Sequence, residues 1–197
     1  VLTSDGTDIS WADAGGGASA IDDLSDALTN SSGGTVGIGT NALANDDGSA
    51  NKNTALGFEA LNDITTGSVS VGFGYQAGDK ITTGVSNTAL GAGSMGAVTT
   101  TNSNVAIGDR AMESPTGANN TFVGKSSGEG GGGAANGNAA LGYGSLEKIT
   151  TGSWNVAVGY GAGVNITSGG TNTMLGSSAG EAVTTAVSSV AIGNTAM

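Results

Sequence analysis

The chain has 197 residues, a formal net charge of −11 and neither cysteine nor histidine. Its negative charge argues against binding to nucleic acid or to an anionic membrane surface, because both would be repelled. The missing residue types exclude disulfide frameworks, thiol nucleophiles, Ser-His pairs and the usual zinc sites. We therefore expect no enzyme activity, no cofactor and no bound metal. No apolar run is long enough to insert into a membrane.

Composition alone leaves the fold ambiguous. Leu, Ile, Val and Phe make up about 18% of the chain, which together with this charge is typical of disordered proteins. Only a regular internal pattern would favour an ordered fold, so repeats decide the interpretation.

The first 34 residues lie outside the repeats. Residues 1–18 are predicted to form an extended segment followed by a Gly-rich linker, and residues 19–34 a short helix and its connection. The helix is inferred from three apolar side chains at helical spacing, Ile21, Leu24 and Leu28. Such a helix is too short to be stable alone, so we expect it to pack against copies from other chains.

Residues 35–197 form one repeat array. Each unit resembles NTALGFEAL at 53–61, and its central glycine, here called the marker glycine, recurs every 16 to 18 residues. The marker glycines are Gly39, Gly57, Gly74, Gly91, Gly108, Gly124, Gly142, Gly159, Gly176 and Gly193. The stretch GEGGGGAANG at 128–137 is interpreted as an inserted turn. Because the sequence stops directly after a repeat motif, we expect the array to be truncated at its C-terminus.

Each unit has the alternation of a short strand. The residue before the marker is always Ile, Leu, Val or Phe, and the residue two positions earlier is Val, Thr or once Ala. These two positions share one face, whereas the opposite face carries the marker and usually Ala or Gly. Such a bare face lets another backbone approach closely. The ITTG segments, as at 64–67, predict a second short strand.

A 17-residue unit cannot bury a core alone, but stacked copies can. The sequence therefore predicts an all-β fold, a parallel β-solenoid or β-roll of about ten 17-residue coils, roughly 50 Å long. We expect an intertwined homotrimer. A monomeric solenoid is the alternative, but it needs a wider apolar interior than coils rich in Ala and Gly are expected to supply.

The motifs carry a resemblance. NVAIG at 104–108, NVAVG at 155–159 and SVAIG at 189–193 resemble the head repeats of trimeric autotransporter adhesins, whose three chains form left-handed parallel β-rolls. The longer phrases NTALGFEALNDITTG and SVGFGYQAGDKITTG, at 53–67 and 70–84, are similar to repeats in tail-fibre and other virion proteins of tailed bacteriophages, especially cyanophages. The opening VLTSDGTDISWADAGGG resembles the linker that precedes such repeats.

The resemblance implies a structural fibre or adhesin segment on a virion surface, hence extracellular. Its partners would be two further copies of the chain, other fibre proteins and a host glycan or protein receptor. Two alternatives remain: the head of a bacterial trimeric autotransporter-type adhesin, and a glycan-degrading tailspike. The units are longer than the autotransporter spacing, and within these 197 residues we expect neither a membrane anchor nor a C-terminal chaperone domain.

Acidic residues recur five positions after the marker, at Asp79, Glu113, Glu129, Glu147 and Glu181. In a solenoid they would line one edge as a ladder of like charges. We interpret this edge as solvated, since Lys80 and Lys148 follow two of the acids. Weak cation binding and a catalytic carboxylate pair are the alternatives.

Aromatic residues directly follow four markers, at Phe58, Tyr75, Tyr143 and Tyr160, and Trp154 occupies a turn. Stacked rings that fill a corner of the coil are the main interpretation. The alternative is a sugar-binding platform, with candidate glycan contacts at Tyr75, Tyr143, Trp154 and Tyr160.

Asparagine precedes seven markers by four residues, at Asn53, Asn87, Asn104, Asn120, Asn138, Asn155 and Asn172. At a turn, stacked asparagines bond to the backbone and to one another, so a structural ladder is predicted.

Overall fold

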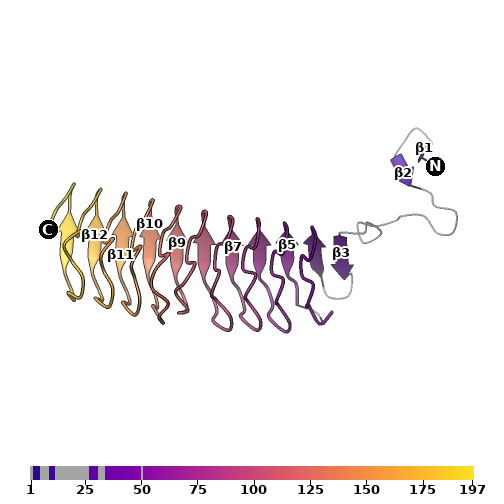
Figure 1. Ribbon diagram of the computed structural model, residues 1–197, viewed down its shortest axis with the longest axis horizontal. Coiled ribbons are helices and arrows are strands. Elements are labelled where there is room, and N and C mark those ends of the chain that lie inside the picture. The colour runs from indigo at the N-terminus through magenta and orange to yellow at the C-terminus, as the bar shows by residue number, and fades with distance from the viewer. Residues whose placement is uncertain (1, 5–8, 12–26, 31–33, 50) are drawn as a thin grey trace.

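The chain is a parallel β-solenoid. The computed structural model describes residues 2–4, 9–11, 27–30, 34–49 and 51–197. Its strands are β1 (Leu2–Ser4), β2 (Ile9–Trp11), β3 (Ala27–Asn30), β4 (Thr35–Ile38), β5 (Thr54–Leu56), β6 (Val71–Phe73), β7 (Thr88–Leu90), β8 (Val105–Ile107), β9 (Thr121–Val123), β10 (Ala139–Leu141), β11 (Val156–Val158), β12 (Thr173–Leu175) and β13 (Val190–Ile192). Strands β3 to β13 form one sheet in sequence order, and β4 to β13 are all parallel. The chain thus makes about nine turns, stacked as a rod (Figure 1).

The N-terminal end differs from the prediction. β1 and β2 pair antiparallel, and β3 pairs antiparallel with β4. The helix predicted within 19–34 is therefore wrong for residues 27–30, while 19–26 lie outside the described residues. Pairing with β4 explains the difference, because it satisfies the backbone groups of an otherwise open sheet edge. A short helix, by contrast, gains few hydrogen bonds for the free energy that its first turn costs. In the part of the chain that the structure describes there is no helix.

The small face of each strand points into the coil. The strand residue two before the marker, such as Ala55, Ala89 or Ala157, is buried, while its neighbours on either side are more exposed. Larger apolar side chains enter the interior four and seven residues after the marker, as Leu61 and Ile64 do. Coils rich in Ala and Gly were expected to supply too narrow an apolar interior for a single chain, but each chain has an apolar interior of its own. The core runs along the whole array.

The marker glycine ends each strand rather than lying within it. Its φ is between +120° and +137° in all ten coils, a region that L side chains rarely adopt. A Cβ on Gly74 would also lie 3.0 Å from the carbonyl carbon of Gly91 in the next coil. The close backbone approach that the sequence predicted is therefore between successive coils of one chain.

The ITTG segments form no strand in the described residues, but they do hold the coils together. Ile64 is buried, and the next two residues bend. The Thr65 N–H donates to the carbonyl oxygen of Thr82 at 2.9 Å, and its hydroxyl donates to the same oxygen at 3.2 Å. These residues bend instead of extending, so the prediction of a second strand is wrong. The segments nevertheless bond to the equivalent residues of the next coil.

The two irregular coils compensate for each other. Gly108 and Gly124 are 16 residues apart, and Gly124 and Gly142 are 18 apart. Strand β9 consequently stays in register with both β8 and β10. The predicted inserted turn lies in the longer coil, where the N–H of Gly131 bonds the carbonyl of Ile149 at 3.1 Å.

The asparagine ladder is confirmed. The Oδ1 atom of Asn104 accepts hydrogen bonds from both the backbone N–H and the side-chain Nδ2 of Asn120, at 3.0 and 3.2 Å. Asn120 Nδ2 also donates to the carbonyl of Ala135 at 2.7 Å. All seven asparagines are buried. Their side chains therefore supply the hydrogen bonds that turn backbone groups, which the strands leave unpaired, would otherwise make with water.

Candidate functional site

The most distinctive surface is the outer side of the parallel sheet. We call it the outer apolar face and define it as the strand residues one and three positions before each marker. Among its large apolar members, the following are exposed: Leu56, Val71, Phe73, Leu90, Leu141, Val156, Leu175, Val190 and Ile192. Phe73 and Leu141 remain 49% and 52% exposed. No residue in either row is charged, although the chain carries a net charge of −11.

A row of aromatic side chains borders this face. The rings of Phe58 and Tyr75 stack in adjacent coils, with centroids 5.5 Å apart and an angle of 8° between planes. Tyr143 and Tyr160 repeat the arrangement at 5.2 Å and 10°. The stacked rings that the sequence predicted are therefore present, and they lie on the surface, where Tyr160 is 63% exposed.

Trp154 does not join the other candidate glycan contacts. It lies two residues before β11, whereas Tyr160 lies two residues after that strand. A Cβ on Gly137, in the preceding coil, would lie 2.6 Å from Cε3 of Trp154, so the indole covers this glycine. Trp154 is exposed, but it belongs to a different edge of the coil from Tyr75, Tyr143 and Tyr160.

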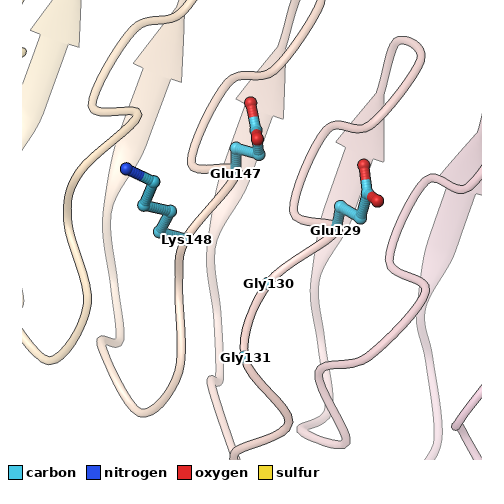
Figure 2. Close-up of a pocket in the computed structure, with 5 residues that line it drawn as sticks. All are labelled: Glu129, Gly130, Gly131, Glu147 and Lys148. Atoms are coloured by element: carbon cyan, nitrogen blue, oxygen red, sulfur yellow. The ribbon is translucent and has the colours of Figure 1, made fainter.

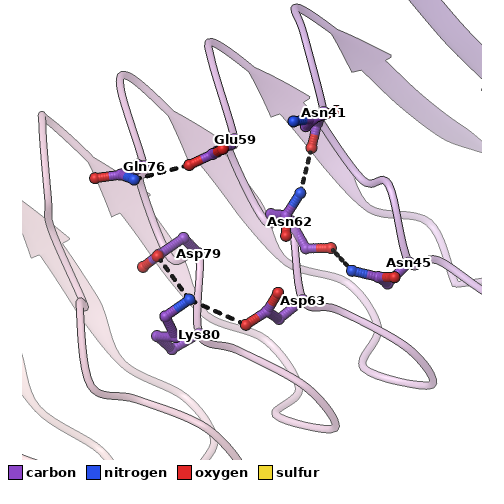
Figure 3. A network of polar contacts seen from close by, with 8 residues as sticks. All are labelled: Asn41, Asn45, Glu59, Asn62, Asp63, Gln76, Asp79 and Lys80. Atoms are coloured by element: carbon purple, nitrogen blue, oxygen red, sulfur yellow. Dashed lines mark hydrogen bonds and ion pairs between the residues drawn. The ribbon is translucent and has the colours of Figure 1, made fainter.

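The acidic edge is partly neutralised by cations. Lys80 Nζ lies 3.1 Å from Asp63 Oδ2 and 3.2 Å from Asp79 Oδ2 (Figure 3). Amide side chains continue the same edge, where Gln76 Nε2 donates to Glu59 Oε2 at 2.8 Å and Asn62 Nδ2 donates to the Asn41 carbonyl at 3.0 Å. These contacts join successive coils along the edge.

Burial and charge act in opposite directions on the ion pair of this edge. Desolvation raises the pKa of the Asp79 carboxyl, and its hydrogen bond with Lys80 opposes the rise. The pKa of Lys80 is raised by its hydrogen bonds to Asp63 and Asp79. Further along the same edge, Arg110 binds Glu129 at 3.0 Å across coils. Sequence reasoning did not assign Arg110 this role, because no other coil has a basic residue two positions after its marker.

One pocket of about 290 Å³ is lined by Glu129, Gly130, Gly131, Glu147 and Lys148 (Figure 2). It brings together two carboxylates from the predicted ladder. Both carboxylates project to the same side of the array instead of facing each other. Glu129 is held by Arg110, while Lys148 donates to Asn165 Oδ1 at 2.8 Å. The pocket therefore lacks the opposed acid and base that glycoside hydrolysis requires.

Within the ranges that the structure describes, no group of three or more acidic side chains is close enough to hold a metal ion. Nor does any helix there have the length and apolarity to cross a membrane.

Comparison with known proteins adds no identification. No protein family, no curated protein and no solved structure matches the chain. The site is therefore interpreted from its own geometry, which presents an uncharged apolar face, an adjoining aromatic row and an outer edge of paired charges.

Proposed function

We propose that the array is the shaft or head segment of a homotrimeric fibre on a virion surface, and that it serves host attachment. The outer apolar face carries this proposal. A soluble monomer rarely exposes a contiguous apolar surface this long, and such surfaces usually mark interfaces. Since neither row of the face contains a charged residue, three copies can bring these faces together without placing negative charges within the contact.

The size of the face sets the area available to such an assembly. Nine coil spacings of about 4.8 Å and a strand of about 10 Å give a strip on the order of 400 Å² per chain. In a trimer each chain shares this strip between two neighbours. The strip is about half of the roughly 800 Å² per partner that is usual for specific interfaces.

The place of the fibre is proposed from the resemblance of the repeats to those of phage fibres. A rod whose coils are bonded along its axis is stiff, and three-fold repetition turns weak surface contacts into avidity. The receptor would be a host glycan or protein. The head of a bacterial adhesin is the alternative, and a membrane-anchor barrel in the full-length gene would favour it. We propose a mechanical function without catalysis.

Light scattering tests the assembly. The expected molar mass is three times 18.6 kDa, and the species should survive SDS unless boiled. Leu90→Glu places a charge in the outer apolar face and should shift the mass to one chain. Thr83→Glu adds the same charge at an exposed bend position and should leave three chains.

Circular dichroism must show both variants folded. A wild-type mass of one chain would contradict the trimer, and so would a folded Leu90→Glu variant that keeps the wild-type mass.

A further inference from the structure

The residues directly after the marker glycines form a row with a five-coil period. In order along the rod they are Thr40, Phe58, Tyr75, Ala92, Asp109, Lys125, Tyr143, Tyr160, Ser177 and Asn194. Each half of the row thus ends in two aromatic residues, one small residue and one Asp or Asn. Backbone bonds show that these positions are stacked, since the carbonyl oxygens of Tyr75 and Ala92 accept from the next coil, from Gly93 N and Arg110 N, at 2.9 Å each.

This order leaves a niche after each aromatic pair. Ala92 is small and exposed, so it forms a floor between the ring of Tyr75 and the side chain of Asp109. Two coil spacings separate these walls, which makes the gap roughly 10 Å. Ser177 is the equivalent floor between Tyr160 and Asn194. In both niches one ring face is covered by its stacked partner. Since the partner belongs to the preceding coil, we infer that the other face is turned toward the gap.

The dimensions suit one saturated ring of a sugar. A ring packs against an aromatic face at about 3.5 to 4.0 Å. The remaining roughly 6 Å accommodates a hydroxyl group and a hydrogen bond of about 2.7 Å to the opposite wall. Asp109 accepts such bonds, and the amide of Asn194 both accepts and donates them.

The charges favour a neutral ligand over a cation. Asp109 alone would attract a cation to the face of Tyr75. Its Oδ1 atom, however, already lies 3.8 Å from Arg110 Nε and 3.6 Å from Lys125 Nζ. The second niche has no carboxylate at the corresponding position, only Asn194. What the two niches share is an aromatic face opposite a hydrogen-bonding group, which is the chemistry of a polyhydroxylated ring.

We propose that the two niches bind pyranose units of a neutral polysaccharide, with Tyr75 and Tyr160 as the stacking faces and Asp109 and Asn194 as the hydroxyl partners. The niches lie five coils apart, roughly 24 Å along the rod, so one extended chain can occupy both. Each niche is built from a single chain. The proposal therefore stands whether or not the rod is a trimer.

Saturation-transfer NMR tests binding with three probes, the linear hexasaccharides of glucose, galactose and mannose. We expect transfer from the protein to the ring C–H protons of at least one probe, with a dissociation constant on the order of millimolar. The decisive variant is Ala92→Tyr with Ser177→Tyr. It adds aromatic surface while filling both niches, and it should weaken binding at least tenfold.

Two further variants separate the niches from aromatic surface in general. Tyr75→Ser with Tyr160→Ser should also abolish binding, whereas Trp154→Ala should leave the affinity within twofold of wild type. Circular dichroism checks folding, and light scattering of each variant shows whether the assembly has changed independently of sugar binding. The proposal is overturned if no probe binds at 10 mM, or if the folded Ala92→Tyr, Ser177→Tyr variant binds as tightly as wild type.

Discussion

Side-chain sizes inside the coil are matched between two positions. Where the residue two before the marker is Phe122, the residue four after it is Gly128, and a Cβ on Gly128 would overlap the phenyl ring. Met174 and Gly180 form the same combination. In other coils the combination is reversed, as with Ala140 and Leu146. Where both positions are small, as with Gly72 and Gly78, Leu61 of the preceding coil fills the space, because a Cβ on these glycines would lie 2.7 and 2.9 Å from its side chain. The interior is thus filled in each of these coils although its residues vary.

This matching predicts a compensating pair of substitutions. Phe122→Ala should leave a cavity and cost about 3 to 5 kcal/mol. Gly128→Leu alone should overpack the coil and also destabilise it. The double variant recreates the combination of Ala140 and Leu146, and leucine accepts this backbone, since Leu146 has a φ of 50°. Urea denaturation should therefore show the double variant to be more stable than either single one. A double variant as unstable as the sum of both losses would contradict the matching.

The buried part of the acidic edge predicts a pH effect. Burial raises the pKa of Asp79 above its usual 3.8, so the folded state holds this proton more strongly than the unfolded state. Its charged form therefore opposes folding at neutral pH, and this cost disappears as the pH falls through the raised pKa. Asp79→Asn should raise Tm relative to wild type more at pH 7 than at pH 3.

Glu181→Gln is the matched control for this titration. It removes the same charge at the same position of another coil, where the residue is exposed. The difference in Tm from wild type should change little between the two pH values. Equal behaviour of the two variants would contradict the role of burial at Asp79.

At the scale of the element, each coil from β5 onward is a three-residue strand followed by a turn with left-handed residues at fixed positions. Besides the marker glycine, the second and fourth residues after it have positive φ, as in Glu59 at 54° and Leu61 at 49°. This conformation costs free energy for residues other than glycine, so contacts with the neighbouring coils have to stabilise it. Sequence preference alone does not predict leucine in this region.

The asparagine ladder has a gap that predicts a stabilising substitution. Ser70 occupies the ladder position of its coil, and its hydroxyl accepts from Asn87 N–H at 3.3 Å. Asparagine there would reach the carbonyl of Gly84, as Asn53 reaches that of Gly67 at 2.8 Å. Each buried hydrogen bond contributes about 1 kcal/mol, so Ser70→Asn should raise the free energy of unfolding by about that amount. Ser68→Asn, outside the ladder, is the control in thermal unfolding. A loss of stability in Ser70→Asn alone would contradict the predicted fit.

At the scale of the molecule, the array is a one-dimensional stack in which each coil bonds only to its neighbours. The strand order follows the sequence throughout, from β3 to β13. The interior row, the asparagine row and the outer apolar rows therefore run without interruption from each coil to the next. Stability in such a protein is a sum of coil and interface contributions.

A deletion follows from this arrangement. Removing residues 92–108 takes out one coil and joins Gly91 to Asp109, so every row stays in phase. The protein should remain folded with cooperative thermal unfolding, and its rod should be shorter by about 4.8 Å. Removing residues 92–99 shifts the rows by half a coil and should lower Tm strongly. Equal loss of structure in both deletions, measured by circular dichroism, would contradict independent stacking of coils.

The sequence by itself determined the repeat, the coil length, the all-β class and the asparagine ladder, because these depend on spacing along the chain. It also placed the aromatic residues in one stacked row. The trimer and the virion surface remain predictions from the resemblance and from the outer apolar face.

Only the tertiary structure decided which face of the strand is inside. Alternation separates a bulky face from a small one, but it does not show which of them meets the rest of the coil. Closure brings Leu61 and Ile64 to the small face around Ala55, and there is no space for a second bulky row. The bulky face is therefore left outside. In the same way, β3 is a strand because it pairs with the edge strand β4, which the helical spacing of its apolar residues does not reveal. Both outcomes depend on contacts between residues distant in sequence, which no local pattern contains.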